Sequence, residues 1–531
     1  MNTDHFHRRL ESLAHDSLVH DLSNGLKGLE KESMRITAAG RLAHSPHPVQ
    51  LGSALTHPHI TTDYSEALLE FITPPFPDAT ATLSFLEDIH RFVYQMLPED
   101  ELLLATSMPI GFEQDEDIPI ARYGSSNIGK MKHIYRVGLA HRYGRTMQAI
   151  AGIHFNFSLA ESLWPLLGEV FQLSLSPKDL RAHLYFSLIR NLHRYGWLLL
   201  YLFGASPAVN GQFLKCRGGI PEGFVEISSD TYGMPHATSL RMSDIGYKNK
   251  TQAGLHISLN SLEEYVTSLC HAIETPHPPY QAIGVKRGGE YLQLNTNILQ
   301  IENEYYSPVR PKQIAESCEK PTLALKRRGV RYVEIRALDI NPFDPLGINQ
   351  GQIHFLEAFL LFCLLHDSPP ITQAENRVIH ANLLASAQRG RDPSLDLLLE
   401  DRPIPLHLWA TEVLQAMEPL CQLMDTSLPI PVYLDSLERQ WKKVHDPDET
   451  PSARVVKEMK THGESFDQFA MRLSKTHADY FRSHPLEPSQ LEWFMKLARQ
   501  SLEEQEQIEA KDSLSFDQFL HRYLSQTCQA A

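Results

Sequence analysis

The chain has 531 residues, of which 42% are hydrophobic and 21% are charged, as in an ordinary soluble protein. This length is well beyond the size at which burying a core is difficult, and it allows about two to four domains. The 64 acidic and 49 basic residues give a net charge of −15, which argues against nucleic acid or an anionic membrane as the main partner. A nucleotide is compatible with this charge, because metal ions can bridge acidic side chains to phosphate.

The N-terminal residues and the cysteines indicate a cytoplasmic protein without a membrane-spanning segment. Residues 1–22 are charged throughout and lack the apolar stretch of a secretory signal. The longest uncharged apolar stretch, Tyr195 to Val209, contains a glycine and a proline and is too short to span a bilayer. The six cysteines are scattered without a CxxC pair, which predicts reduced thiols at Cys216, Cys270, Cys318, Cys363, Cys421 and Cys528.

The first part of the chain predicts helices and strands in alternation. Leucines spaced along residues 1–25 indicate a helix before the first strand. Residues 26–110 are predicted as a strand, a turn-rich loop, a short helix or strand, a helix and a further strand. A helix is predicted over 130–150, a strand over 151–158 and long helices over 162–203.

The second part of the chain changes from strands to helices. Residues 285–340 carry strand patterns, notably in YLQLNTNILQIENEYY and RYVEIRALDI. Beyond Asn341 the apolar residues follow the period of a helix. We therefore predict a strand-containing catalytic core over residues 1–366 and a helical C-terminal region over 367–531 packed on it. One continuous domain is the alternative.

Polar side chains two residues apart recur inside apolar, strand-like runs. The pattern occurs in three segments, as Glu30 with Glu32, His154 with Asn156, and Glu334 with Arg336. Because successive side chains on a strand point to opposite faces, each pair shares one face. Asp63 and Glu70 add carboxylates in a stretch that fits either a helix or a strand. Any one pair alone is more often a solvated strand face, but together they suggest bound cations, most simply magnesium with a polyphosphate.

No familiar glycine loop accompanies these acids. The sequence contains neither GxxxxGK[ST] nor a GxGxxG after a strand, and it has no zinc signature. A nucleotide would therefore be held by metals and by basic side chains, of which Arg336 and Lys312 are the nearest candidates. Arg136 and Arg241 lie near tyrosines and could each hold an amino-acid carboxylate by two parallel hydrogen bonds. The alternative is that both are ordinary surface or interface residues.

A longer run of motifs carries a family resemblance. The segments are GLEKESMRI, LGSALTHPHITTDYSEALLEFITP, RYGSSNIGKMKHIYRVGLAHRYG, QAIAGIHFNFSL, YGWLLLYLFGASPA, PHATSLRMSDIGYKNKTQ, LQLNTNILQIENEYYSPVRPK and GVRYVEIRALDINPFDP. Together, and in this order, they resemble glutamate–cysteine ligase of the proteobacterial type. The resemblance extends over residues 25–350 and fades in the helical C-terminal part.

The resemblance implies a fold, a reaction and a set of ligands. The fold is α+β and similar to glutamine synthetase, with a curved, largely antiparallel sheet forming a funnel, surrounding helices and a helical C-terminal region. The reaction joins the γ-carboxylate of L-glutamate to the amine of L-cysteine through a γ-glutamyl phosphate, the first step of glutathione biosynthesis. It consumes ATP and needs more than one Mg²⁺ ion, for which Mn²⁺ can substitute. We expect a monomer that binds neither nucleic acid nor membrane.

The resemblance also places the site residues. The family's metal ligands fall on Glu30, Glu32, Asp63, Glu70, His154 and Glu334. Catalytic roles fall on Glu32, Glu334 and Arg336, of which Arg336 stabilises the transferring phosphoryl group. Substrate-binding roles fall on Tyr64, Tyr135, Arg136, Leu139, Gln148, Asn156, Arg241, Tyr247 and Tyr306. At Tyr64 the family pattern leads us to expect Phe, so its hydroxyl leaves acceptor selectivity open. The polar segment 111–132 is a candidate for a loop that shields the acyl phosphate from water.

Three other functions are compatible with the sequence. A related carboxylate–amine ligase with a different acceptor would differ only in its product. A guanidino kinase of the same fold family would form no ligation product. An inactive metal- or nucleotide-binding protein would bind nucleotide without turning it over.

Overall fold

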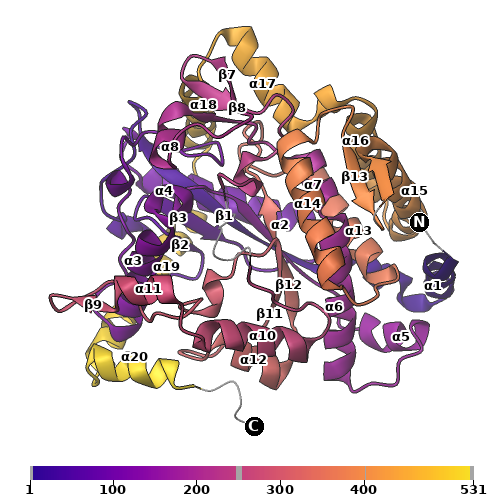
Figure 1. Ribbon diagram of the computed structural model, residues 1–531, viewed down its shortest axis with the longest axis horizontal. Coiled ribbons are helices and arrows are strands. Elements are labelled where there is room, and N and C mark those ends of the chain that lie inside the picture. The colour runs from indigo at the N-terminus through magenta and orange to yellow at the C-terminus, as the bar shows by residue number, and fades with distance from the viewer. Residues whose placement is uncertain (1–3, 247–253, 401, 527–531) are drawn as a thin grey trace.

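The computed structural model describes residues 4–246, 254–400 and 402–526, and an open antiparallel sheet lies at its centre (Figure 1). The strands run in the order β11-β12-β5-β1-β3-β2, and β4 pairs with the end of β1. Every pairing between these strands is antiparallel. Their bounds are Leu26–Thr37 (β1), Ile60–Thr62 (β2), Leu68–Ile72 (β3), Glu101–Leu103 (β4), Ile153–Ser158 (β5), Val309–Lys312 (β11) and Tyr332–Leu338 (β12). The predicted α+β class with a largely antiparallel sheet is confirmed.

Helices cover the apolar face of the sheet. They are α2 (Ala79–Met96), α6 (Pro177–Tyr195), α7 (Trp197–Phe203) and α13 (Gln350–Leu365), of which α2 contacts β1, α6 contacts β11, and α7 contacts β12. On β5, Ile153, Phe155 and Phe157 are fully buried. Helix α13 is buried from Gln352 to Leu365, which is why its sequence is apolar on every side. Apolar packing thus covers one face of the sheet and not the other.

A buried ion pair joins the first strand to the C-terminal helices. Lys27 on β1 lies 2.6 Å from Glu357 on α13, and both side chains are almost completely buried. The hydroxyl of Tyr433, on α16 (Val432–His445), donates to the other oxygen of Glu357 at 2.7 Å. One hydrophobic cluster also runs through the sheet core and these helices. The division at residue 366 stays a prediction.

The last helices return to the first third of the chain. Helix α18 (Phe466–Ser483) contacts α2 and β4, and α19 (Pro488–Lys511) contacts residues 49–51. Helix α20 (Phe516–Leu524), yellow in Figure 1, contacts α3 (Asn127–Tyr143). Asn127 at the start of α3 donates from its backbone to Asp512 and from its side chain to Leu514. The bounds of the helices beyond α13 are Gln373–Arg389 (α14), Leu406–Asp425 (α15), Pro451–His462 (α17), Phe466–Ser483 (α18), Pro488–Lys511 (α19) and Phe516–Leu524 (α20).

The other predicted elements of the first half are present with adjusted bounds. The predicted N-terminal helix is α1 (Asp4–Ala14), followed by a 3₁₀ helix over Ser17–Ser23. The region predicted as helical over 130–150 contains α3 and α4, and α5 precedes α6. Other helices and strands up to residue 328 are α3 (Asn127–Tyr143), α4 (Arg145–Gln148), α5 (Leu163–Val170), β6 (Ala208–Asn210), α8 (Gly211–Cys216), β7 (Val225–Ser228), β8 (Thr231–Gly233), α10 (Leu262–Glu274), α11 (Pro278–Ile283) and α12 (Pro321–Arg328).

One strand prediction and one helix prediction are wrong. The segment from Tyr291 onward was expected to be a strand, but only a short hairpin forms, from β9 (Lys286–Arg287) and β10 (Glu290–Tyr291). The side chains of Asn295 and Asn297 bond to backbone groups, which competes with a strand ladder. Conversely, the region expected to be helical contains a hairpin of β13 (Asp396–Leu399) and β14 (Arg402–Pro405).

The cysteines differ from expectation at one position. Cys216, Cys318, Cys363 and Cys421 are free thiols, whereas Cys270 takes part in a disulfide. The prediction of reduced thiols throughout is therefore wrong for Cys270, because spacing along the sequence does not report which sulfurs meet in space. Cys528 lies outside the described residues.

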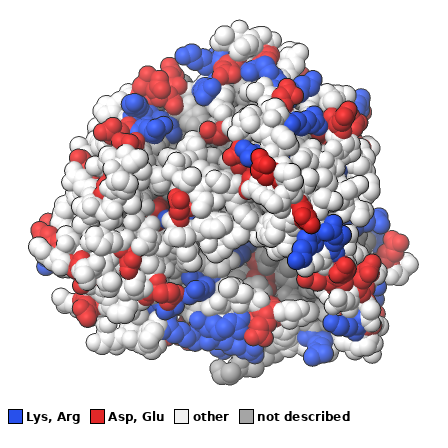
Figure 2. Space-filling view, turned by 180° about the vertical axis from the view of Figure 1, so that it is seen from behind, with Lys and Arg blue, Asp and Glu red and all other residues white. Residues whose placement is uncertain are grey.

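The surface shows no single dominant charge on the face drawn in Figure 2. There, Asp and Glu are interspersed with Lys and Arg, apart from a basic patch along the lower edge. Among the described helices, none is both long and apolar enough to cross a bilayer.

Candidate active site

Strand register brings the predicted polar pairs onto one face of the sheet. Glu30 on β1 lies opposite His154 on β5, and Glu32 lies opposite Glu70 on β3. Asn156 lies opposite Glu334 on β12. Residues that are directly opposite on antiparallel strands point to the same side. The polar pairs of the different strands therefore lie on the same face of the sheet.

Three of these side chains lie close enough to hold one metal ion. Ligand atoms of Glu30, His154 and Glu334 all lie within 4.8 Å of one another. Nδ1 of His154 is 3.0 Å from Oε2 of Glu30 and 3.7 Å from Oε1 of Glu334, and its Nε2 is 3.8 Å from Oε1 of Glu32. Carboxylate oxygens with one imidazole are a donor set that divalent cations accept.

Charge crowding marks the same group of acids. Burial, followed by the charge of Asp63, raises the pKa of Glu32 to about 8. Burial, together with Glu30, Asp63 and Glu32, raises the pKa of Glu70 well above its usual range. Buried carboxylates that repel one another are costly unless a positive charge compensates them. The cluster therefore fits bound cations.

Basic side chains flank the cluster on the β11–β12 side. Arg336 donates from Nη1 to Glu334 at 3.0 Å, and Nζ of Lys312 lies 3.5 Å from the other oxygen of Glu334. Although burial acts in the opposite sense, Lys312 and Arg336 hold the pKa of Glu334 well below its usual range. The pairing of β12 with β5 is irregular between Ile335 and Leu338, so Arg336 lies within β12 at an irregularity of the sheet.

A buried polar atom next to Glu30 is left without a partner in the described part of the chain. Asn156 donates to Glu30 at 2.9 Å, while its buried Oδ1 has no hydrogen-bond partner within the described part of the chain. A buried acceptor of this kind is normally satisfied by a ligand or water.

The described residues that were predicted to form the acceptor pocket are buried or half-buried, and two of them are hydrogen-bonded to each other. Nε2 of Gln148, the last residue of α4, donates to the hydroxyl of Tyr306 at 2.7 Å. Burial raises the pKa of the Tyr64, Tyr135 and Tyr306 phenols, so all three stay neutral. Tyr64 is 1% exposed, and its hydroxyl has no hydrogen-bond partner among the residues described. Leu139 on α3 is also buried.

The two predicted carboxylate-binding arginines make backbone contacts. Arg136 donates to the carbonyl groups of Asp63 and Lys132 and stacks on Tyr123, with its guanidinium carbon 4.7 Å from the ring centre. Arg241 donates to the carbonyl of Arg336 at 2.9 Å. Their roles in binding substrate carboxylates stay predictions. Tyr247, which was predicted to bind substrate, lies outside the described residues.

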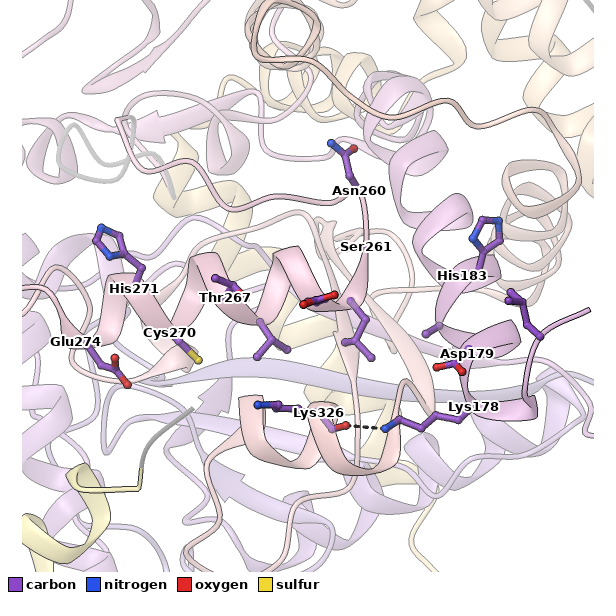
Figure 3. Close-up of a pocket in the computed structure, with 15 residues that line it drawn as sticks. Lys178, Asp179, His183, Asn260, Ser261, Thr267, Cys270, His271, Glu274 and Lys326 are labelled. Atoms are coloured by element: carbon purple, nitrogen blue, oxygen red, sulfur yellow. Dashed lines mark hydrogen bonds between the residues drawn. The ribbon is translucent and has the colours of Figure 1, made fainter. Parts of the chain in front are cut away.

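Arg241 also lines a hollow shared with two other predicted residues. This space of about 90 Å³ is bounded by Arg241, Tyr306 and Arg336, together with Met242, Ser307, Pro308, His380 and Leu383. Three predicted site residues from distant parts of the sequence therefore border one space. A larger hollow of about 680 Å³ lies elsewhere, between α6, α10 and α12 (Figure 3). It contains none of the predicted residues, so it is not the candidate site.

Sequence reasoning missed residues that support the site from outside. The hydroxyl of Tyr123 contacts the carbonyl oxygens of Thr62 and Asp63, at 2.8 and 2.9 Å. Asp115 accepts hydrogen bonds from the backbone of α4, which carries Gln148. Both residues lie within the polar segment that was singled out as a loop, but only the fold reveals their partners.

Comparison with known proteins identifies the family. A family model described as glutamate-cysteine ligase matches residues 10–385. The chain belongs to the glutamate–cysteine ligase family. The glutamate–cysteine ligase of Azotobacter vinelandii is 51% identical over 522 residues, and that of Pseudomonas aeruginosa is 49% identical over 521 residues. Each alignment covers 98% of both chains, so similarity to glutamate–cysteine ligases extends through the C-terminal helices, further than the motifs alone indicated.

Solved structures agree with this family. The crystal structure of glutamate–cysteine ligase from Francisella tularensis in complex with AMP matches with a TM-score of 0.89 at 38% identity, covering 94% of this chain and 97% of that chain. A bifunctional glutathione synthetase from Pasteurella multocida matches with a TM-score of 0.72 at 27% identity, over 91% of this chain and 57% of that one. The predicted family and fold class are confirmed, and so is the interpretation of the chain as a ligase.

Proposed function

We propose that the chain joins the γ-carboxylate of L-glutamate to the amine of L-cysteine with hydrolysis of ATP to ADP and phosphate. The observation that carries this proposal is the Glu30–His154–Glu334 cluster on a sheet shared with a glutamate–cysteine ligase that was crystallised with AMP. We further propose that the enzyme acts as a cytoplasmic monomer on these small molecules.

The acidic cluster is suited to more than one Mg²⁺ ion, with Mn²⁺ able to substitute. Both are small cations that prefer hard oxygen donors and tolerate imidazole. We assign as ligands Glu30, Glu32, Asp63, Glu70, His154 and Glu334. When bound, Mg²⁺ neutralises charge on the phosphate oxygens. Asn156, whose Oδ1 is unsatisfied among the described residues, supports a place for the nucleotide on the same face.

Arg336 and Lys312 supply fixed positive charge for phosphoryl transfer. Arg336 stabilises the γ-phosphoryl oxygens while the bond from phosphorus to the β,γ-bridging oxygen breaks and the bond to the γ-carboxylate oxygen of glutamate forms. The γ-glutamyl phosphate carries a much better leaving group than the carboxylate. The amine of cysteine then attacks the acyl carbon, phosphate departs, and the amine loses a proton. The negative charges of Glu32 and Glu334 compensate the positive charge of Arg336 during both steps.

The tyrosine-rich pocket receives the acceptor. Tyr64, Leu139 and Gln148 are buried, Tyr135 and Tyr306 are half-buried, and Gln148 is hydrogen-bonded to Tyr306. Such a pocket offers apolar surface for a small side chain and a few hydroxyl groups to orient it. Arg136 and Arg241 are assigned to the substrate carboxylates, with a rearrangement of their present backbone contacts on binding.

An ADP-release assay with product identification tests the proposal. ATP, Mg²⁺ and glutamate are supplied with cysteine, with 2-aminobutyrate or with neither acceptor, and products are identified by mass. Cysteine-dependent release of ADP with the mass of γ-glutamylcysteine is expected. Turnover with 2-aminobutyrate alone would keep the ligase chemistry but assign a different acceptor. The absence of turnover with folded, Mg²⁺-loaded protein would overturn the proposal.

A further inference from the structure

The two sides of the acceptor pocket are carried by different parts of the chain. Tyr64 follows β2, whereas Gln148 ends the four-residue helix α4. A helix of one turn is unstable by itself, because few of its backbone groups are paired within it. The direction of α4, and hence the position of Gln148, must therefore be set by contacts from outside the helix.

Asp115 makes those contacts at the start of α4. Its carboxylate accepts from the backbone nitrogens of Arg145 at 2.8 Å and Thr146 at 2.7 Å, and from the Thr146 hydroxyl at 2.8 Å. Arg145 donates in return from Nη1 to the carbonyl groups of Glu116 and Ile118, at 3.0 Å each. Asp115 is half-buried, so these bonds are partly shielded from water.

Glycine makes this approach possible. Gly144 precedes α4 with φ of +81°, and a β-carbon there would lie 3.3 Å from Oδ1 of Asp115. A side chain at this position would be strained by the backbone conformation and would crowd the carboxylate. The local sequence thus allows a close contact between Asp115 and the first turn of α4.

The same segment is also tied to Tyr64. The carbonyl of Pro119 accepts from the Ser65 hydroxyl at 2.8 Å and from the Glu66 backbone at 2.9 Å. Ala121 donates from its backbone nitrogen to the carbonyl of Tyr64 at 3.0 Å. Residues 115–121 therefore connect α4 to the chain that carries Tyr64.

We propose that Asp115 is a positioning residue for the amine acceptor, because it fixes Gln148 and its partner Tyr306 relative to Tyr64. This inference rests on the proposed function, which places these three residues in the cysteine pocket. Asp115 itself contacts backbone and the Thr146 hydroxyl, so its effect reaches the substrate through α4. The segment predicted to be a closing loop acts here as a fixed brace.

Steady-state kinetics of Asp115→Ala and Asp115→Asn test this role. Asp117→Asn is the matched control, because Asp117 lies in the same turn but accepts from Glu113 and Gln114 within it. Asp115→Ala removes the bonds from all three donors and should raise the KM for cysteine on the order of tenfold, because only part of the lost stabilisation of α4 reaches the bound acceptor. The KM values for ATP and glutamate should change less than about twofold on the same reasoning, since their proposed sites lie elsewhere. Asp115→Asn, which keeps one acceptor oxygen, should restore most of the affinity.

The outcomes separate this inference from the proposed function. Gln148→Ala and Tyr64→Phe are measured alongside as direct changes to the pocket. If they alter cysteine kinetics while both Asp115 variants match Asp117→Asn, the positioning role is wrong and the pocket stands. If neither alters cysteine kinetics although the enzyme turns over, the pocket itself is misplaced and the inference falls with it. Equal losses for all three substrates would show a general structural role and would also overturn it. If Asp115→Ala does not fold, Asp115→Asn tests the positioning role instead, and a smaller rise in the KM for cysteine alone is expected. An unchanged KM for cysteine in Asp115→Asn would then overturn the inference.

Discussion

Replacing Glu32 by glutamine should have opposite effects on activity and on the stability of the metal-free protein. Glu32 faces Glu70 across the β1–β3 pair, and its Oε2 accepts from the backbone of Gly152 at 2.6 Å. Glutamine keeps an oxygen for that bond and removes one charge from the cluster. Loss of a charge-bearing ligand should lower turnover by on the order of 10²-fold.

The size of the stability change follows from the pKa of Glu32. Burial and Asp63 raise this pKa from 4.5 to about 8, so the folded state holds the proton more tightly than the unfolded state. Stability from this group is present below pH 4.5 and is lost as the pH rises towards 8. At pH 7 the loss amounts to about 3 kcal/mol in the absence of cations, which Glu32→Gln should recover.

Urea unfolding in EDTA at pH 5 and pH 7 measures this difference. The wild type should lose stability between the two pH values, and Glu32→Gln should lose less. Added Mg²⁺ should stabilise the wild type more than the variant, because ligand binding to the folded state adds to its stability. Glu492→Gln, an exposed acid on α19, is the control. A variant that is less stable than the wild type in EDTA at pH 7, or that keeps normal turnover at limiting Mg²⁺, would refute the reasoning.

Three further changes test other parts of the structure. Tyr64→Phe removes a buried hydroxyl that has no partner among the described residues. The ratio of kcat/KM values should shift towards 2-aminobutyrate relative to cysteine, with ATP use unchanged. An unaltered ratio would show that Tyr64 is not part of the acceptor pocket. Glu357→Gln leaves the buried ammonium of Lys27 without its carboxylate partner and should lower the free energy of unfolding in urea by about 3–5 kcal/mol. The double variant with Lys27→Met should regain much of this stability. If it does not, the loss of the ion pair is not the cause of the destabilisation. Removal of divalent cations by EDTA should abolish turnover, and Mg²⁺ or Mn²⁺ should restore it; activity that persists in EDTA would exclude the cation site from the reaction.

The shared face of each polar pair could be predicted from the sequence because it depends on local geometry alone. His154 and Asn156 alternate with phenylalanines, and a strand has a period of two. Their meeting with Glu30 and Glu334 depends on strand register, which no single segment specifies. Glu70 was ambiguous for the same reason, since only its pairing with Glu32 in β1 shows that it belongs to a strand. The family resemblance, rather than periodicity, supplied that long-range information.

Other features depend on competition between side chain and backbone. The run after Tyr291 alternates like a strand, yet Asn295 and Asn297 satisfy nearby backbone groups and prevent a ladder. The role of Arg136 in binding a substrate carboxylate stays a prediction, and in the fold its guanidinium donates to carbonyl groups, including that of Asp63. The sequence does not show which acceptor these side chains bond to, because this depends on which acceptor lies within hydrogen-bonding distance after folding.

The return of the last helices to α3 has a consequence for biosynthesis. Asn127 begins the helix that bears Tyr135, Arg136 and Leu139. It is hydrogen-bonded to Asp512 and Leu514, which follow it in the sequence by 385 and 387 residues. On the ribosome, the sheet and its acidic cluster can form long before those late residues emerge. The brace on α3 cannot form until synthesis is nearly complete. A nascent chain could therefore capture metal well before it can hold its amine acceptor, so unfinished molecules would be poorly equipped to use ATP for ligation.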